Sequence, residues 1–274
     1  MKRLIILLAF VLFAAAGCQE KKPADYTRLG DFTPNSSLQE KLNGKVESVV
    51  EKSYWAIPDG DTYIRGARLT RHEIDSLKIS NDFRAEFDAG GNLVSCTTID
   101  ENDAVITRRD MIKVNELVTR AEFRSGDTLK SYVIITSKDD GLPTLYESFD
   151  ALTDTLRQRF DETGTDISDT IRVRGFSPGG ELQGTAEYVY NELGLLTSTY
   201  GYGPDGTLEG RMEIKYNDRG FMSEIKFKEG EGKIKTMYTL TYEQVDNGNW
   251  VRAIFRDHED DRIFITERVI TYFE

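Results

Sequence analysis

The feature that most constrains this chain is an alternation of apolar and polar residues with a period of two. In residues 211–216, three apolar residues alternate with three charged ones, and residues 224–228 and 238–243 repeat the pattern. Successive side chains of a β-strand point to opposite faces, so this pattern predicts strands with one buried and one solvated face. Tyr, Phe, Ile, Val and Thr predominate in these segments, as is typical of strands.

Turn signals rich in Gly, Asn and Asp separate these segments at regular intervals. The turn glycines are Gly180, Gly194, Gly206, Gly220, Gly232 and Gly248. Successive ones are 14, 12, 14, 12 and 16 residues apart. Two turn types alternate, an aromatic-Asn type as in residues 188–194 and an Asp-Gly-x-Leu type as in residues 205–208. The resulting repeat of about 26 to 28 residues indicates hairpins that bury their apolar faces against one another.

These patterns predict an all-β fold, built as one long antiparallel meander of about fourteen to sixteen strands in repeated hairpins. A twisted sheet rarely exceeds about ten strands without curling. We therefore expect the meander to curl around its apolar face or to fold into two packed layers. Residues Ser37–Glu40 fit a capping box, so we expect at most a short helix near the N-terminus.

The N-terminus has the features of an export signal. Lys2 and Arg3 precede an apolar run, and small residues precede Cys18. The apolar stretch of residues 4–17 is shorter than the roughly 20 residues of a membrane-spanning helix. Residues 15–18 resemble the lipobox of bacterial lipoproteins, which implies cleavage after residue 17 and acylation of Cys18, including palmitate-like chains that anchor the protein in a membrane.

The chain is therefore divided into three parts. Residues 1–17 form the signal peptide, residues 18–41 form the lipidated cysteine and a flexible tether, and residues 42–274 form a single β-hairpin-repeat domain with its clearest repeats in 176–274. The localisation that follows is the bacterial cell envelope, with the outer membrane as the favoured site of anchoring.

The charge of the chain limits its partners. The formal net charge is −12, and removal of the signal with its two basic residues takes it to −14. An acidic body argues against nucleic acid, because phosphate binding needs a basic surface. Once Cys18 is acylated, Cys96 remains alone, which leaves no intramolecular disulfide and no structural zinc site of the usual kind.

The repeats resemble YD-repeat proteins, the rearrangement-hotspot-type family of bacterial envelopes, in lipoproteins of Bacteroides-like bacteria. The resemblance rests on Phe87–Leu93, Tyr190–Leu196, Tyr216–Gly220 and Asp246–Val251. It is clear over residues 176–274 and fainter over residues 42–175. Family membership implies a β-hairpin repeat fold and does not imply an enzyme.

Candidate catalytic and metal-binding residues are few. His72 and His258 lie in charged segments with no nucleophile elbow, and we interpret both as surface residues. Residues 100–103 and 257–261 gather carboxylates, but neither has the spacing of a calcium loop, and we interpret them as acidic turns. We expect no catalytic residues, metal or cofactor, and we interpret Cys96 as a buried small apolar residue.

Aromatic residues offer the one candidate ligand site. Tyr200, Tyr202 and Trp250 are candidates for an exposed platform that stacks sugar or peptide, with the glycines beside the two tyrosines baring their rings. The competing interpretation is that such aromatics pack the core face of the sheet.

Three functions follow as hypotheses. The preferred one is a non-catalytic, membrane-anchored scaffold or binding module for an envelope protein or a glycan. The alternatives are a glycan hydrolase that uses paired carboxylates and a carrier that holds lipid or lipoprotein in an apolar cavity.

Overall fold

The computed structural model of the protein describes residues 26–29, 40–77, 79, 82–114, 117–137, 143–164, 170–230 and 232–274. The signal peptide and Cys18 lie outside the described residues, as do residues 37–39 of the expected helical turn. Within the described part, 19 strands and one helix follow one another along the chain. Their bounds are β1 Tyr26–Leu29, β2 Glu40–Asn43, β3 Val46–Asp59, β4 Thr62–Arg68, α2 Arg71–Leu77, β5 Phe83–Phe87, β6 Leu93–Ile99, β7 Val105–Val114, β8 Leu117–Ser125, β9 Thr128–Ser137, β10 Pro143–Asp150, β11 Leu156–Gly164, β12 Thr170–Phe176, β13 Leu182–Tyr190, β14 Leu196–Tyr202, β15 Leu208–Tyr216, β16 Met222–Glu229, β17 Lys235–Asp246, β18 Asn249–Asp257 and β19 Arg262–Tyr272.

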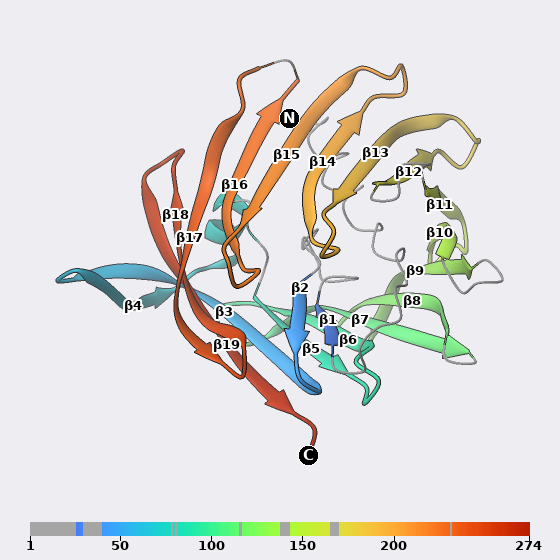
Figure 1. Ribbon diagram of the computed structural model, residues 1–274. Helices are drawn as coiled ribbons and strands as arrows, with labels where there is room; N and C mark the ends of the chain where they lie inside the picture. Colours follow the sequence, from blue (N-terminus) through green and yellow to red (C-terminus); the bar gives the residue numbers. More distant parts are fainter. Residues whose placement is uncertain are drawn as a thin grey trace.

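The strands close into a barrel (Figure 1). From β5 to β19 each strand pairs antiparallel with the next, and β19 pairs with β3 from Phe264↔Trp55 to Tyr272↔Val46. Because β3 also pairs directly with β5, β3 and the fifteen strands β5–β19 form a ring of 16 strands. The prediction of an all-β hairpin meander is confirmed, and the curl that we expected is a full closure.

A repeated five-residue turn explains the regular spacing in the sequence. In each copy the first residue donates its N–H to the fifth carbonyl, and the fourth residue donates to the first carbonyl. The fourth residue has φ between 65° and 84°, the left-handed region that favours glycine. The copies are residues 88–92, 100–104, 177–181, 191–195, 203–207 and 217–221.

The two alternating turn types lie at opposite ends of the barrel, because successive strands of a meander run in opposite directions. We call one end the entry rim, which carries the Asn-type turns 191–195 and 217–221, the β17–β18 turn and the start of β3. The other end is the arm rim, which carries turns 177–181 and 203–207.

Side chains alternate between a buried inner face and an exposed outer face. Val49, Ala85 and Cys96 are neighbours across three strands, and each is at most 1 % exposed. On the outer face, charged residues stand opposite one another, as Asp110 and Glu122 do. The prediction that Cys96 is a buried residue is confirmed, and burial raises the pKa of its thiol to about 11.

The helix and the tether differ from expectation. The helix α2 lies between β4 and β5, and Glu40 belongs to strand β2. Strands β1 and β2 form a two-stranded sheet, and Leu42 of β2 is 1 % exposed within the apolar cluster of the barrel. Among the described residues, no helix has the length and apolarity required to cross a membrane.

Candidate binding surfaces

The regular repeat is interrupted once in the described wall, between β3 and β5. Where a short turn would connect these two paired strands, the chain instead extends β3, returns as β4 and forms α2. The hairpin of residues 54–68, which we call the arm, projects from the side of the barrel (Figure 1). Insertions into repeat proteins commonly carry the binding surface.

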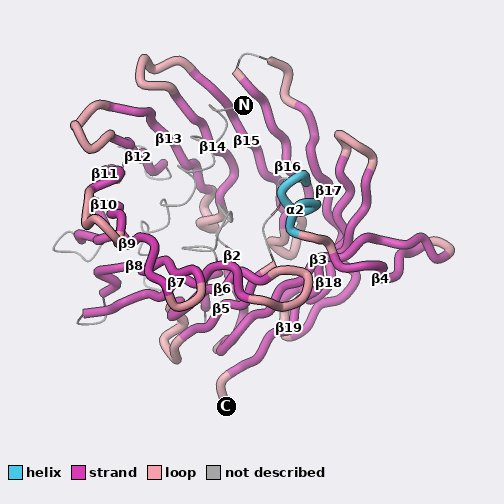
Figure 2. Tube along the Cα trace, turned by 180° about the vertical axis from the view of Figure 1, so that it is seen from behind, coloured by secondary structure: helices cyan, strands magenta, loops and turns pink. Residues whose placement is uncertain are grey.

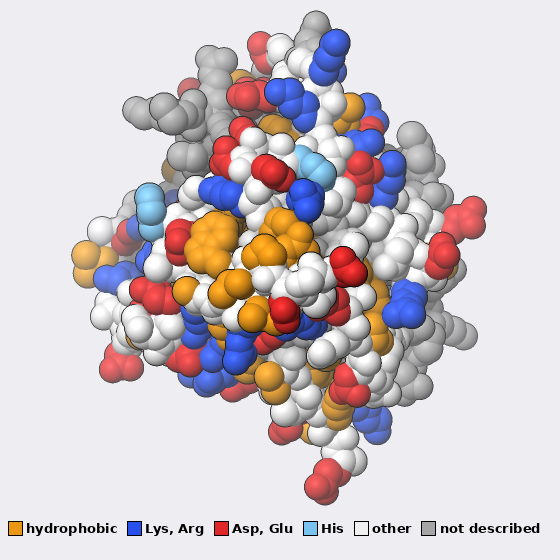
Figure 3. Space-filling model, turned by 90° about the vertical axis from the view of Figure 1, so that its left-hand side faces the viewer, with side chains coloured by type: hydrophobic (Ala, Val, Ile, Leu, Met, Phe, Trp, Pro, Cys, Tyr) orange, Lys and Arg blue, Asp and Glu red, His pale blue; other side chains and the backbone are white. Residues whose placement is uncertain are grey.

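Two isoleucines give the arm an exposed apolar face. Ile57 and Ile64 are directly opposite each other in the hairpin, and each is 47 % exposed. Gly66 permits the close packing beneath them, because a Cβ there would lie 3.0 Å from Ile57 Cγ1 and 2.9 Å from the Trp55 carbonyl oxygen. Figure 3, which views the molecule from the side of the arm, shows apolar side chains gathered at the centre of this face with charged groups around them.

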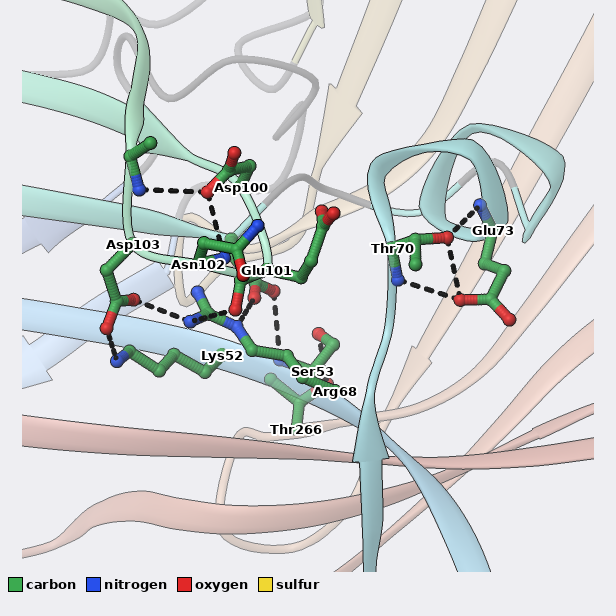
Figure 4. Close-up of polar contacts among 12 residues, drawn as sticks. Lys52, Ser53, Arg68, Thr70, Glu73, Asp100, Glu101, Asn102, Asp103 and Thr266 are labelled. Atoms are coloured by element: carbon green, nitrogen blue, oxygen red, sulfur yellow. Dashed lines mark hydrogen bonds and ion pairs between the residues drawn. The ribbon is translucent and has the colours of Figure 1, made fainter.

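A polar network fixes the base of the arm to the barrel (Figure 4). Arg68 donates to Asp82 at 2.8 Å and to Asp103 at 2.5 Å, and Lys52 pairs with Asp103 at 2.8 Å. Asp82 also accepts the Ser53 backbone N–H at 2.8 Å. Hydrogen bonds from Lys52 and Arg68 lower the pKa of Asp103, whereas burial raises the pKa of Asp82 against the opposing effect of Arg68.

The helix α2 adds a second brace to the arm. Thr70 and Glu73 form a capping box, in which the Thr70 N–H donates to Glu73 at 2.7 Å and the Glu73 N–H donates to Thr70 Oγ1 at 3.4 Å. The other Glu73 oxygen accepts Trp55 Nε1 at 2.8 Å, which ties the helix to β3. Ile74 and Leu77 are buried in an apolar cluster with residues of β17 and β19, and Figure 2 shows α2 beside β16 and β17.

The outer edge of the arm is partly covered. Pro58, which has no N–H to donate, is opposite Tyr63 in the hairpin. The Tyr63 carbonyl accepts Arg252 Nη2 at 2.8 Å, and Arg65 pairs with Glu267 at 3.1 Å. These two contacts occupy part of this edge, whereas Ile57 and Ile64 on the isoleucine face are each 47 % exposed.

The predicted stacking residues are separated by the fold. Tyr200 and Tyr202 both lie on the outer face of β14 and are half-buried. The Arg211 guanidinium lies 5.1 Å from the centre of the Tyr200 ring, and the Tyr202 hydroxyl donates to Glu187 at 3.3 Å. These two tyrosines remain a candidate contact surface, with one ring already stacked by arginine.

The expectation that Trp250 is exposed for stacking is wrong. Its side chain is 3 % exposed, the Arg268 guanidinium lies 3.5 Å from its ring centre, and Tyr242 packs against it at 5.6 Å between ring centres. The sequence did not show which face of β18 the ring would occupy, because the turn before it sets the parity of the strand.

The residue beside Trp250 has a role that the sequence did not indicate. Asn249 is buried, at 2 % exposed. Its side chain forms two hydrogen bonds with the backbone of Asn43: it accepts the N–H at 2.7 Å and donates to the carbonyl at 2.9 Å. Asn249 also donates to the Tyr272 hydroxyl at 3.0 Å. This clamp, which joins β2, β18 and β19, fixes the point where the chain enters the barrel.

The candidate calcium residues are held in turns and ion pairs. Asp100 caps its own turn by accepting the N–H groups of Asn102 and Ala104, and Arg262 pairs with both Asp257 and Asp260. In the described ranges, no group of three or more His, Cys, Asp or Glu side chains is placed to hold a metal ion. His258 is exposed and lies 3.0 Å from Thr239 Oγ1.

The fold and these surfaces define a closed β-barrel of hairpin repeats with one inserted arm. No protein-family model matches the sequence, and no curated protein matches it. A solved porin-like protein from Bacteroides uniformis ATCC 8492 is 12 % identical, with a TM-score of 0.35, and the match covers 82 % of this chain and 96 % of that chain. A porin-like protein from Bacteroides vulgatus ATCC 8482 is 10 % identical, with a TM-score of 0.38 and coverage of 83 % and 98 %.

A third solved structure is the Tc holotoxin pore of Photorhabdus luminescens, at 10 % identity and a TM-score of 0.32. The match covers 89 % of this chain but 14 % of that one, so this chain spans a small part of the toxin's length. TM-scores at this level do not establish a shared fold or function.

Proposed function

We propose that this chain is a lipid-anchored, non-catalytic binding protein of the bacterial cell envelope, held at the outer membrane through Cys18. The barrel is a rigid support, and the arm is the surface that contacts a partner protein. The observation that carries this proposal is the pair Ile57 and Ile64, exposed on an arm whose base is braced by Arg68 and α2. Exposed apolar side chains on a rigid projection favour protein contact.

The charged outer face supports anchoring by lipid. Arg172 pairs with Glu187 at 2.6 Å and Lys215 with Glu224 at 2.8 Å on outward positions of neighbouring strands. Strands that face lipid carry an apolar band, because charges at that depth are costly. The outer face therefore favours contact with water, which leaves acylation of Cys18 as the means of attachment.

Photo-crosslinking in cells tests the partner contact. A photoreactive phenylalanine analogue replaces Ile64 in one variant and Leu152 in the control, since Leu152 is 93 % exposed at the arm rim away from the arm. We expect a discrete adduct from position 64 that the second substitution Ile57→Asp abolishes. Equal adduct patterns from both positions, or none from position 64, would contradict the assignment of the arm.

Mass spectrometry of the mature chain tests the anchor. We expect an N-terminal peptide that begins at Cys18 and carries acyl chains, and loss of membrane association in Cys18→Ser. A mature N-terminus elsewhere, or an unmodified Cys18, would refute the lipoprotein assignment.

A carrier of an apolar ligand is the second candidate. Its support is the apolar character of the inner face, where Tyr146, Phe160 and Val173 lie on adjacent strands. A ring of 16 strands has a circumference larger than wall side chains alone fill. Organic extraction of the purified protein followed by mass spectrometry tests this candidate, and extraction of no stoichiometric lipid would count against it.

No observation among the described carboxylates favours the glycan-hydrolase alternative. A glycan partner in place of a protein would use Tyr200 and Tyr202, and loss of binding to an envelope glycan in Tyr200→Ala would be the sign of that contact.

A further inference from the structure

The path of the chain into the barrel places Tyr26, the first described residue, at one end of the molecule. Strand β1 pairs with β2 in the register Tyr26↔Asn43 to Leu29↔Glu40, so Tyr26 lies beside Asn43. Asn43 is held by the Asn249 clamp and donates from its side chain to the Gly248 carbonyl at 2.8 Å. Gly248 and Asn249 belong to the entry rim, so the chain before Tyr26 starts from that rim.

The length of chain before Tyr26 limits how far this rim can lie from the anchor. Cys18 and Tyr26 are eight positions apart in the sequence, with seven residues between them. A chain of eight such steps spans at most about 28 Å when fully extended, and a random coil of that length has a mean span of about 16 Å. A strand of nine residues such as β13, tilted as barrel strands are, gives the wall a height of about 22 Å.

We propose that the entry rim is the membrane-facing surface of this protein and that its partner is a lipid bilayer. The inference rests on the proposed acylation of Cys18. A tether this short, fixed at one rim, holds the turns 191–195 and 217–221 beside the lipid headgroups. It holds the opposite rim, beyond which the arm extends from β3, away from them.

Energy transfer from single dyes to a headgroup-labelled lipid tests this orientation. The acylated full-length chain is placed in phosphatidylethanolamine–phosphatidylglycerol vesicles that contain a rhodamine-headgroup lipid. Asp218→Cys carries the dye on the entry rim, and Glu181→Cys carries it on the arm rim, both at exposed acidic turn residues. Labelling of the native protein spares Cys96, because its thiol is buried.

We expect transfer from position 218 to be at least about twofold more efficient than from position 181, because the two rims differ in height by about 20 Å. Insertion of twenty Gly and Ser residues between Cys18 and Tyr26 should bring the ratio close to one, because the tether then spans about 30 Å on average. A ratio near one or below one in the unmodified, vesicle-bound protein would overturn the orientation.

A flotation assay separates this result from failure of the anchor. If the acylated chain floats with vesicles and Cys18→Ser does not, the anchor holds and the dye ratio alone decides the orientation. If Cys18→Ser floats equally well, the lipid anchor is refuted, and the orientation that rests on it is refuted too.

Discussion

A single buried amide joins distant parts of the chain at the entry rim. Asn249 satisfies both backbone groups of Asn43, which lies 206 residues earlier, and a tyrosine hydroxyl of the last strand. Its neighbour Gly248 has φ of 77°, and a Cβ there would lie 2.8 Å from Asn43 Nδ2. The close approach of the two segments therefore depends on both residues of the pair.

Replacement of Asn249 by alanine should destabilise the barrel by about 2 kcal/mol, because Asn43 is left with backbone groups that have lost their partner. Urea unfolding followed by tyrosine and tryptophan fluorescence measures the loss. The exposed turn residue Asn102 is the control, and Asn102→Ala should change the free energy of unfolding by less than about 0.5 kcal/mol. Equal effects of the two substitutions would show that the clamp does not stabilise the fold.

Cys96 should be chemically inert in the folded protein. Its thiol is buried, and its pKa of about 11 leaves little thiolate at pH 8. In the Cys18→Ser chain, where it is the remaining thiol, we expect Ellman's reagent to react slowly under native conditions and fully in guanidinium chloride. Rapid reaction of the native protein at pH 8 would mean that the strand opens or that the side chain faces outward.

At the scale of the element, one turn geometry accounts for most of the repeat. In the Asn-type turns the side chain of the first residue accepts following N–H groups, as Asn191 accepts those of Leu193 and Leu195 and Asn217 accepts those of Arg219 and Phe221. The fourth residue takes the left-handed conformation. The residue types at these turn positions can be recognised in the sequence, which is why the hairpin meander was predictable.

Matched glycines in one turn test this geometry. Gly180 has φ of 84° and Gly179 does not have a positive φ, although both lie open to solvent in turn 177–181. Gly180→Ala should cost about 1 kcal/mol of unfolding free energy, whereas Gly179→Ala should be neutral or slightly stabilising. Thermal unfolding of the two variants measures the difference, and a reversed order would refute the assigned turn.

Features that depend on distant contacts were not predictable in the same way. The closure of β19 on β3 joins segments about 200 residues apart, and nothing local in either strand indicates its partner. The arm interrupts the repeat with strands whose alternation looks like that of the wall. The capping box Thr70–Glu73 is a sequence signal for the start of α2, of the same kind as the one at residues 37–40.

The sequence likewise does not indicate which aromatic side chains are exposed. Of the three aromatics considered as a platform, Trp250 is buried, as the competing interpretation holds, whereas Tyr200 and Tyr202 face outward. Each β-bulge after a turn shifts the parity of a strand by one residue, and the sequence does not display where a bulge falls. The YD-repeat resemblance and the acylation of Cys18 stay predictions.

At the scale of the whole molecule, stability depends on the seam that closes the ring. Glu51 of β3 and Arg268 of β19 are opposite each other on the inner face, at 2.7 Å, and the Arg268 guanidinium also covers the Trp250 ring. Both side chains are nearly buried, at 11 % and 5 % exposed. A barrel has no open edges only while this seam is paired, because each strand otherwise offers its backbone groups to other chains.

Removal of one partner from this buried pair should therefore loosen the seam first. Arg268→Met leaves the Glu51 carboxylate buried without its guanidinium, and we expect a loss of about 3 to 5 kcal/mol in urea unfolding. The double variant Glu51→Gln, Arg268→Met should recover part of that loss, because the carboxylate that lost this guanidinium is then replaced by an uncharged amide. Hydrogen exchange of the β3 and β19 amides should accelerate more than that of β12 and β13 in the single variant.

The outward pair Arg174 and Asp161, at 3.4 Å, supplies the control, and Arg174→Met should cost less than about 1 kcal/mol of unfolding free energy. If the single and double seam variants lose the same stability and exchange uniformly, the charge pair does not hold the barrel closed, and packing of β3 against β19 must do so alone.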